Sequence, residues 1–116
     1  MSIISIDFDG VINKLKESTP GEFGPPVEGA LGAVLNFLRD GFEVIIYTAR
    51  SDLKEVRQWL TEHGFPKIIV TNTKYSSDVY VDDKGYRFSS WDNTVIYDIK
   101  DLAGRKTELA GGRLYR

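Results

Sequence analysis

Short apolar runs alternate with helical patterns along the chain. Four runs rich in β-branched residues occupy residues 2–6, 42–48, 67–70 and 78–81. Continuous runs of this length are typical of strands buried on both faces, as in a parallel sheet covered by helices. The sequence therefore predicts four strands of a parallel sheet.

Helical patterns fill the intervals between these runs and follow the last one. They predict helices over residues 31–38, 54–62 and 93–102. In the first, apolar residues recur at three- and four-residue spacing: Leu31, Val34, Leu35 and Leu38. Ser51 is expected to cap the second helix, and Asp92 or Asn93 the third. This alternation predicts an α/β fold whose parallel strands are joined by right-handed crossovers.

The chain is expected to form one domain over residues 1–116, with two irregular segments. Residues 13–26, rich in Lys, Glu, Gly and Pro, directly follow the first predicted strand. Loops at the carboxyl ends of parallel strands are where such sheets bind ligands, so we expect this segment to be a flap beside a site. Residues 104–116 are Gly-rich and basic, and they are expected to be a solvated tail.

Composition excludes several classes of protein. The 116 residues carry a formal net charge of -2, no cysteine and one histidine, His63. These counts exclude a disulfide framework, a thiol nucleophile, a zinc–thiolate site and a two-histidine relay. The apolar runs are far shorter than the ~20 residues of a membrane span, and the N-terminus lacks the basic start of a signal peptide. No basic stripe predicts nucleic-acid binding. We expect a soluble, cytoplasmic protein.

Acidic and polar residues follow each predicted strand: Asp7-Phe8-Asp9-Gly10, Tyr47-Thr48-Ala49-Arg50, Thr71-Asn72-Thr73-Lys74 and Asp82-Asp83-Lys84-Gly85. The carboxyl ends of parallel strands lie on the same edge, so these groups should converge. Converging carboxylates are costly unless a cation neutralises them or some stay protonated. Oxygen ligands without His or Cys favour a hard ion such as Mg²⁺. An Asp at a strand end can also act as a nucleophile toward a phosphoryl group.

In this order, the residues resemble the four motifs of the haloacid dehalogenase-like (HAD) superfamily: Asp7-Phe8-Asp9-Gly10-Val11-Ile12, Thr48, Lys74 and Asp82-Asp83. The resemblance runs from the first predicted strand to about Phe88. It implies a Rossmann-like parallel sheet flanked by helices and Mg²⁺-dependent phosphoryl transfer. The position of Asp9, two residues after Asp7, is typical of the phosphatases of this superfamily. The expected activity is phosphomonoester hydrolysis through an aspartyl-phosphate intermediate.

The resemblance also implies roles for single residues. Asp7 would be the nucleophile and a metal ligand. Asp9 would be the general acid and then the general base, with its backbone carbonyl on the metal. Asp82 and Asp83 would complete the metal site. The expected substrate-binding residues are Gly10, Thr48, Ala49, Arg50 and Lys74, of which Thr48 would hold a phosphoryl oxygen and Lys74 would stabilise the phosphoryl charge.

Some assignments stay open. Lys84 is an alternative to Lys74, because the spacing from Lys74 to Asp82 is short. Arg50 reads either as a surface residue at a helix start or as a substrate-phosphate contact. Phe23 and Tyr75 are candidate substrate contacts at the site edge.

The chain departs from most of the superfamily because it has no room for a cap domain, so it resembles the capless branch. An open site permits a large substrate such as a nucleic-acid end, a saccharide or a protein. Alternatively, a neighbouring subunit of a homo-oligomer closes over a small substrate such as a nucleotide.

Two other classes of function are open. A phospho-accepting receiver domain has a similar size and similar strand-end residues, although it places its phosphorylated Asp after the third strand. A HAD-like binding protein without activity is the other alternative.

Overall fold

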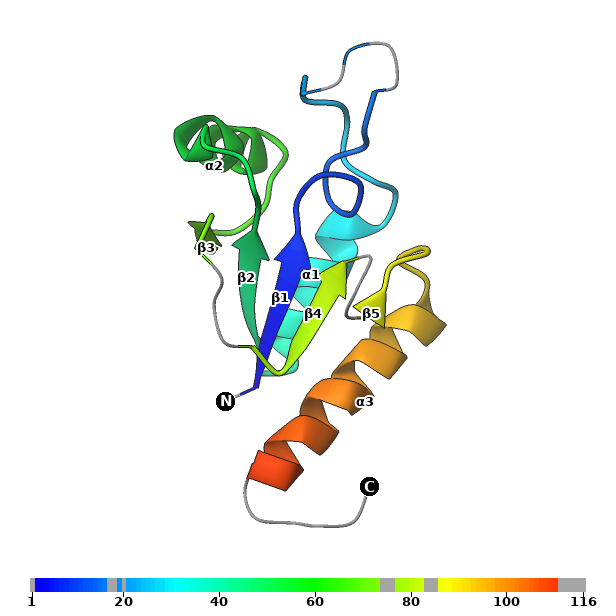
Figure 1. Cartoon of the computed structure of the whole chain (residues 1–116). Coiled ribbons are helices and arrows are strands. Elements are labelled where there is room, and N and C mark those ends of the chain that lie inside the picture. Colours follow the sequence, from blue (N-terminus) through cyan, green and yellow to red (C-terminus); the bar gives the residue numbers. More distant parts are fainter. Residues whose placement is uncertain (1, 17–18, 20, 74–76, 83–85, 111–116) are drawn as a thin grey trace.

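The structure, a computed structural model, describes residues 2–16, 19, 21–73, 77–82 and 86–110, with only the backbone described for 105–110. Within these residues, five strands form one parallel sheet in the order β3-β2-β1-β4-β5 (Figure 1). The strands are β1 Ile3–Asp7, β2 Glu43–Tyr47, β3 Ile69–Thr71, β4 Val79–Asp82 and β5 Tyr86–Arg87. The four predicted strands and their parallel pairing are confirmed. The two-residue strand β5 is too short to give a pattern in the sequence.

Three helices flank the sheet in the described part of the chain: α1 Ala30–Arg39, α2 Leu53–Glu62 and α3 Asn93–Ala110. All three are close to their predicted positions, and the α/β class is confirmed. The prediction of a tail from residue 104 is wrong for residues 104–110, which continue α3. These residues are mostly good helix formers, which offsets the cost of about 1 kcal/mol for Gly104 inside a helix. Residues 111–116 lie outside the described residues.

The two predicted helix caps have different outcomes. At α3, the Val95 N–H donates to the Asp92 carboxylate at 2.9 Å, so the predicted cap is confirmed. At α2, the prediction of Ser51 is wrong, because the N-cap position belongs to Asp52 and makes no side-chain cap bond. The Asp52 carboxylate accepts a hydrogen bond from Arg50 instead.

The hydrophobic core surrounds the central strands. Buried apolar side chains from β1, β2 and β4 pack against residues from all three helices, Trp59 of α2 among them, and against Trp91, which precedes α3. Leu35, part of the predicted apolar stripe of α1, is 47% exposed. The buried face of that helix consists of Ala30, Ala33, Val34 and Phe37. In the described part of the chain, no helix is long and apolar enough to cross a membrane.

The strand register fixes which residues meet at the carboxyl edge of the sheet. Ile6 of β1 is paired with Val81 of β4, so Asp7 and Asp82 follow directly from paired positions on neighbouring strands. On the other side of β1, Asp7 is paired with Tyr47 at the end of β2. Residues far apart in the sequence therefore converge at one edge.

Candidate active site at the carboxyl edge of the sheet

A tight turn follows β1 and presents the first acidic pair. The carbonyl of buried Phe8 accepts hydrogen bonds from the N–H groups of Ile12 at 2.9 Å and Asn13 at 2.8 Å. Gly10 has a φ of 84°, a backbone conformation that residues with a side chain rarely adopt, so glycine suits the turn. A Cβ on Gly10 would meet Leu15 only at ordinary contact distance, 3.5 Å. The requirement for glycine is therefore conformational.

A cavity of about 310 Å³ lies beside this turn, lined by Asp7, Asp9, Gly10, Val11, Asp82, Arg87 and Phe88. Its carboxylates come from the end of β1, the turn after it and the end of β4, and its guanidinium comes from β5. The structure thus brings Asp7, Asp9, Gly10 and Asp82 together, as the sequence predicts.

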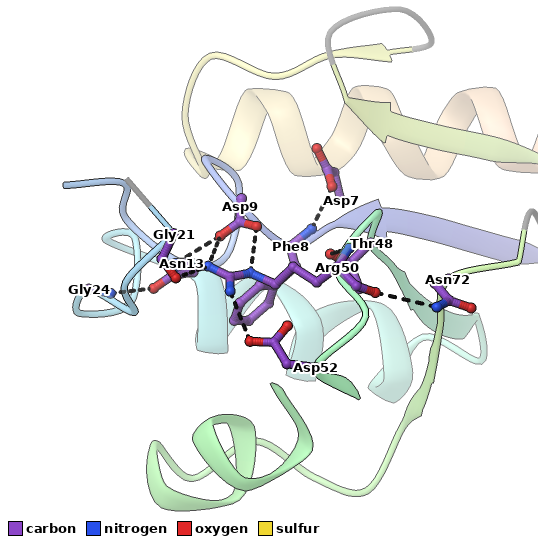
Figure 2. Close-up of polar contacts among 10 residues, drawn as sticks. All are labelled: Asp7, Phe8, Asp9, Asn13, Gly21, Gly24, Thr48, Arg50, Asp52 and Asn72. Atoms are coloured by element: carbon purple, nitrogen blue, oxygen red, sulfur yellow. Dashed lines mark hydrogen bonds and ion pairs between the residues drawn. The ribbon is translucent and has the colours of Figure 1, made fainter. Parts of the chain in front are cut away.

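The two acids that flank Phe8 point in different directions. An oxygen of Asp7 accepts the N–H of Phe8 at 2.9 Å, which fixes the side chain close to its own backbone. In Figure 2, the Asp7 carboxylate points away from the Arg50 guanidinium, whereas the Asp9 carboxylate faces it. The two carboxylates therefore have separate surroundings.

Asp9 forms a two-pronged ion pair with Arg50. Arg50 Nε lies 2.8 Å from Asp9 Oδ2, and Arg50 Nη2 lies 3.2 Å from Asp9 Oδ1. Asn13 Nδ2 also donates to Oδ1, at 3.0 Å. The Arg50 side chain is only 13% exposed, and its hydrogen bonding to the Asp9 carboxylate is the main cause that raises the pKa of Arg50 above its ordinary value. Two parallel hydrogen bonds between a guanidinium and a carboxylate hold the two groups in one relative orientation and also strengthen the ion pair.

Arg50 also joins the end of β2 to the flap, the segment 13–26. Its Nη1 donates to Asp52 at 3.1 Å, and its Nη2 donates to the carbonyl of Gly21 at 2.9 Å (Figure 2). The guanidinium carbon lies 4.6 Å from the centre of the Phe23 ring, within the range of a cation–π contact. Phe23, a candidate substrate contact from the sequence, thus packs on Arg50.

The described part of the flap is fixed to the domain at Asn13 and Gly24. The side chain of Asn13 is buried, and its Oδ1 accepts the N–H of Gly24 at 2.8 Å. The indole N–H of Trp59 in α2 donates to the Gly24 carbonyl at 3.0 Å. A Cβ at Gly24 would lie 2.1 Å from the carbonyl oxygen of Lys14, so only glycine fits this close approach. These contacts hold the flap beside the turn that carries Asp9.

The β2 end supplies the remaining described candidates. Thr48 is buried, and its hydroxyl oxygen accepts the N–H of Arg50 at 3.2 Å. Ala49 is exposed. The described residues that line the cavity do not include Thr48, Ala49 or Arg50. Of these three, Arg50 is joined to the cavity through its ion pair with Asp9. Four other candidates lie outside the described residues: Lys74, Tyr75, Asp83 and Lys84.

The donor set at the cavity fits a hard cation in type. Within the described residues, no group of three His, Cys, Asp or Glu side chains is arranged to hold a metal ion. However, Mg²⁺ usually keeps several waters and takes only one or two protein carboxylates. Asp7 and Asp82, both at the cavity, supply oxygen donors of that kind. The residues present therefore fit Mg²⁺ in donor type and number.

Three features of the site do not follow from the sequence reasoning. Arg87 and Phe88 line the cavity, but they come with a strand that has no recognisable pattern. Asn13 reads as the first residue of a polar loop, although its side chain is buried. For the ion pair between Asp9 and Arg50, the position of Arg50 at a strand end is the one available signal.

The chain matches no protein-family model and no curated protein. It is similar in structure to a conserved protein from Bacteroides thetaiotaomicron, with a TM-score of 0.67 and 18% sequence identity over 97% of this chain and 98% of that one. At this identity, the similarity shows a shared fold.

Proposed function

We propose that the chain is a Mg²⁺-dependent phosphomonoester hydrolase of the HAD type that acts through an aspartyl-phosphate on Asp7. The observation that carries the proposal is that Asp7, Asp9 and Asp82 line one cavity at the carboxyl edge of a parallel sheet. Open α/β sheets bind ligands at this edge. The order of the motif residues in the sequence supports the same reading.

In the first half of the proposed reaction, a carboxylate oxygen of Asp7 attacks the phosphorus atom. The bond between phosphorus and the leaving oxygen breaks, and Asp9 gives that oxygen a proton. In the second half, Asp9 takes a proton from a water molecule whose oxygen attacks the phosphorus. The acyl-phosphate P–O bond then breaks, which releases inorganic phosphate and restores Asp7.

The metal would be held by Asp7, Asp82 and the backbone carbonyl of Asp9, together with Asp83. When bound, Mg²⁺ neutralises the clustered carboxylates and the negative charge on the phosphoryl oxygens. Thr48 and Lys74 would contribute further donors to those oxygens. We place the enzyme in the cytoplasm, with a nucleotide, a nucleic-acid end or a saccharide phosphate as candidate substrates.

The test is a panel of phosphomonoesters assayed with Mg²⁺ and with a chelator. Wild-type protein should release phosphate only with Mg²⁺. Asp7→Asn should lower kcat by at least about 10³-fold, the scale expected when a nucleophile is removed, while its circular dichroism stays that of the wild type. Asp98→Asn, at an exposed carboxylate on α3, is the matched control and should keep full activity. Full activity in Asp7→Asn would refute the mechanism.

The same panel, extended by a small phosphodonor and a measurement of protein phosphorylation, separates the two other classes of function. A receiver-like protein would take a phosphoryl group from a small donor and keep it for seconds or longer without turnover. A binding protein without activity would release no phosphate from any ester. Either result would replace the proposal.

A further inference from the structure

The orientation of Asp9 is fixed by three hydrogen bonds. A carboxylate offers about four acceptor positions on its two oxygens. Oδ1 accepts from Arg50 Nη2 and from Asn13 Nδ2, whereas Oδ2 accepts only from Arg50 Nε. Among the described residues, no group occupies the second position on Oδ2. Oδ2 of Asp9 therefore keeps one acceptor position, and Asp9 is among the residues that line the cavity.

Arg50 takes its own position from the flap. The nitrogen that holds Asp9 Oδ1 also donates to the carbonyl of Gly21, and the Phe23 ring lies against the guanidinium. Asp52 binds the remaining terminal nitrogen at 3.1 Å. Because the guanidinium is rigid and planar, a shift of the flap would tilt the fork that holds Asp9.

From these contacts we infer that Arg50 is a positioning residue. It couples the position of the flap to the orientation of Asp9, the general acid and base. This inference rests on the proposed phosphatase function. Arg50 acts through Asp9, and its contacts with Gly21 and Phe23 transmit the position of these flap residues to the proton-transfer step. A lysine would keep the charge of Arg50 but lose the fork.

The effect of the leaving group tests this role. An alkyl phosphate needs its leaving oxygen protonated, whereas the nitrophenolate of p-nitrophenyl phosphate leaves without much help from an acid. Arg50→Lys should therefore lower kcat/KM by about 10²-fold on glycerol phosphate, a typical contribution of general acid catalysis, and by less than about tenfold on p-nitrophenyl phosphate. The constant kcat/KM is compared because it reports the step in which the leaving group departs, and not the later hydrolysis of the aspartyl-phosphate, which both substrates share. Asp9→Asn should show the same selective loss. The double variant should lose little more than Asp9→Asn alone, because the two residues act as a unit.

A purely structural or phosphate-binding role would give different results. Equal losses of kcat/KM on both substrates would overturn the inference. Full additivity of the Asp9 and Arg50 substitutions would overturn it as well. The matched control is Arg57→Lys, at an exposed arginine on α2, which should leave both substrates unaffected.

Hydrogen exchange tests the coupling to the flap without any enzymatic assay. The N–H of Gly24 donates to the side-chain oxygen of Asn13, and the side-chain nitrogen of Asn13 donates to Asp9. Asp9 in turn is paired with Arg50. Arg50→Lys should speed exchange at Gly24 by about tenfold or more, because the flap opens more often. Unchanged exchange at Gly24 would show that the flap is not coupled to Arg50. If the wild type hydrolyses no ester, the proposed function fails, whereas this measurement still decides the coupling.

Discussion

At the scale of single residues, Arg87 is the cationic side chain among the described residues that line the cavity. It lies at the end of β5, and in the described part of the chain it forms no ion pair, whereas Arg50 is fully engaged with Asp9 and Asp52. Phe88 lines the same cavity next to it. If the proposed function holds, Arg87 would suit a second anionic group of the substrate.

We expect Arg87→Ala to raise KM for a nucleoside bisphosphate by about tenfold, because a hydrogen bond to a charged group contributes about 1.5 kcal/mol or more. KM for a phosphomonoester without a second charge should stay within about twofold. Steady-state kinetics on the two substrates measures this difference. Arg39→Ala, which removes an exposed arginine at the end of α1, is the control. An equal change in KM for both substrates would rule out this role for Arg87.

At the scale of secondary-structure elements, the start of α3 depends on the ionised form of Asp92. The N–H of Val95 and the hydroxyl of Ser90 donate to this carboxylate, and these bonds lower the pKa of Asp92 below its ordinary value. A carboxyl whose pKa is lower in the folded state stabilises the fold above its unfolded pKa. That contribution is lost as the pH falls through the folded value.

Comparison with Asp92→Asn isolates the contribution of the charge, because Asn caps a helix about as well as Asp. Near neutral pH, the wild type should unfold at a higher temperature than Asp92→Asn. The difference should close as the pH falls below about 3.9, the ordinary pKa of Asp. Thermal unfolding at a series of pH values measures it. A difference that persists unchanged at low pH would mean that the ionised carboxylate is not the source of the stabilisation.

At the scale of the whole molecule, two buried indoles that are far apart in the sequence hold the segment after β1. Trp59 in α2 donates to the carbonyl of Gly24, and Trp91, just before α3, donates to the carbonyl of Val11 at 2.9 Å. The position of the candidate site thus depends on both helices as well as on the sheet.

Replacing either indole by Phe should lower the free energy of unfolding by about 1–3 kcal/mol, because a buried carbonyl loses its donor. Denaturant unfolding measures this change. Tyr97→Phe, at a side chain that is 67% exposed, should change the stability by less than about 0.5 kcal/mol. Tryptophan variants as stable as the wild type would show that these hydrogen bonds do not hold the segment.

The sequence predicts the sheet because its strands are apolar runs set between helical patterns. The convergence of Asp7 and Asp82 follows from the parallel pairing alone. In contrast, the pairing of Arg50 with Asp9 depends on the path of a flap that has no periodic pattern. Arg87 escapes the sequence reasoning for a related reason, since two residues of β5 cannot show alternation. Strands and helices can therefore be predicted from the sequence because their patterns are periodic, whereas side-chain contacts that depend on loop geometry cannot.

The most direct test of the account is to trap the covalent intermediate. Wild-type protein is mixed with a phosphomonoester and Mg²⁺, quenched in acid and digested, and the peptides are analysed by mass spectrometry. We expect one added phosphoryl group on the peptide that contains Asp7, located on Asp7 itself and absent from Asp7→Asn. A phosphoryl group on any other residue, or turnover with no labelled peptide at any quench time, would contradict the account.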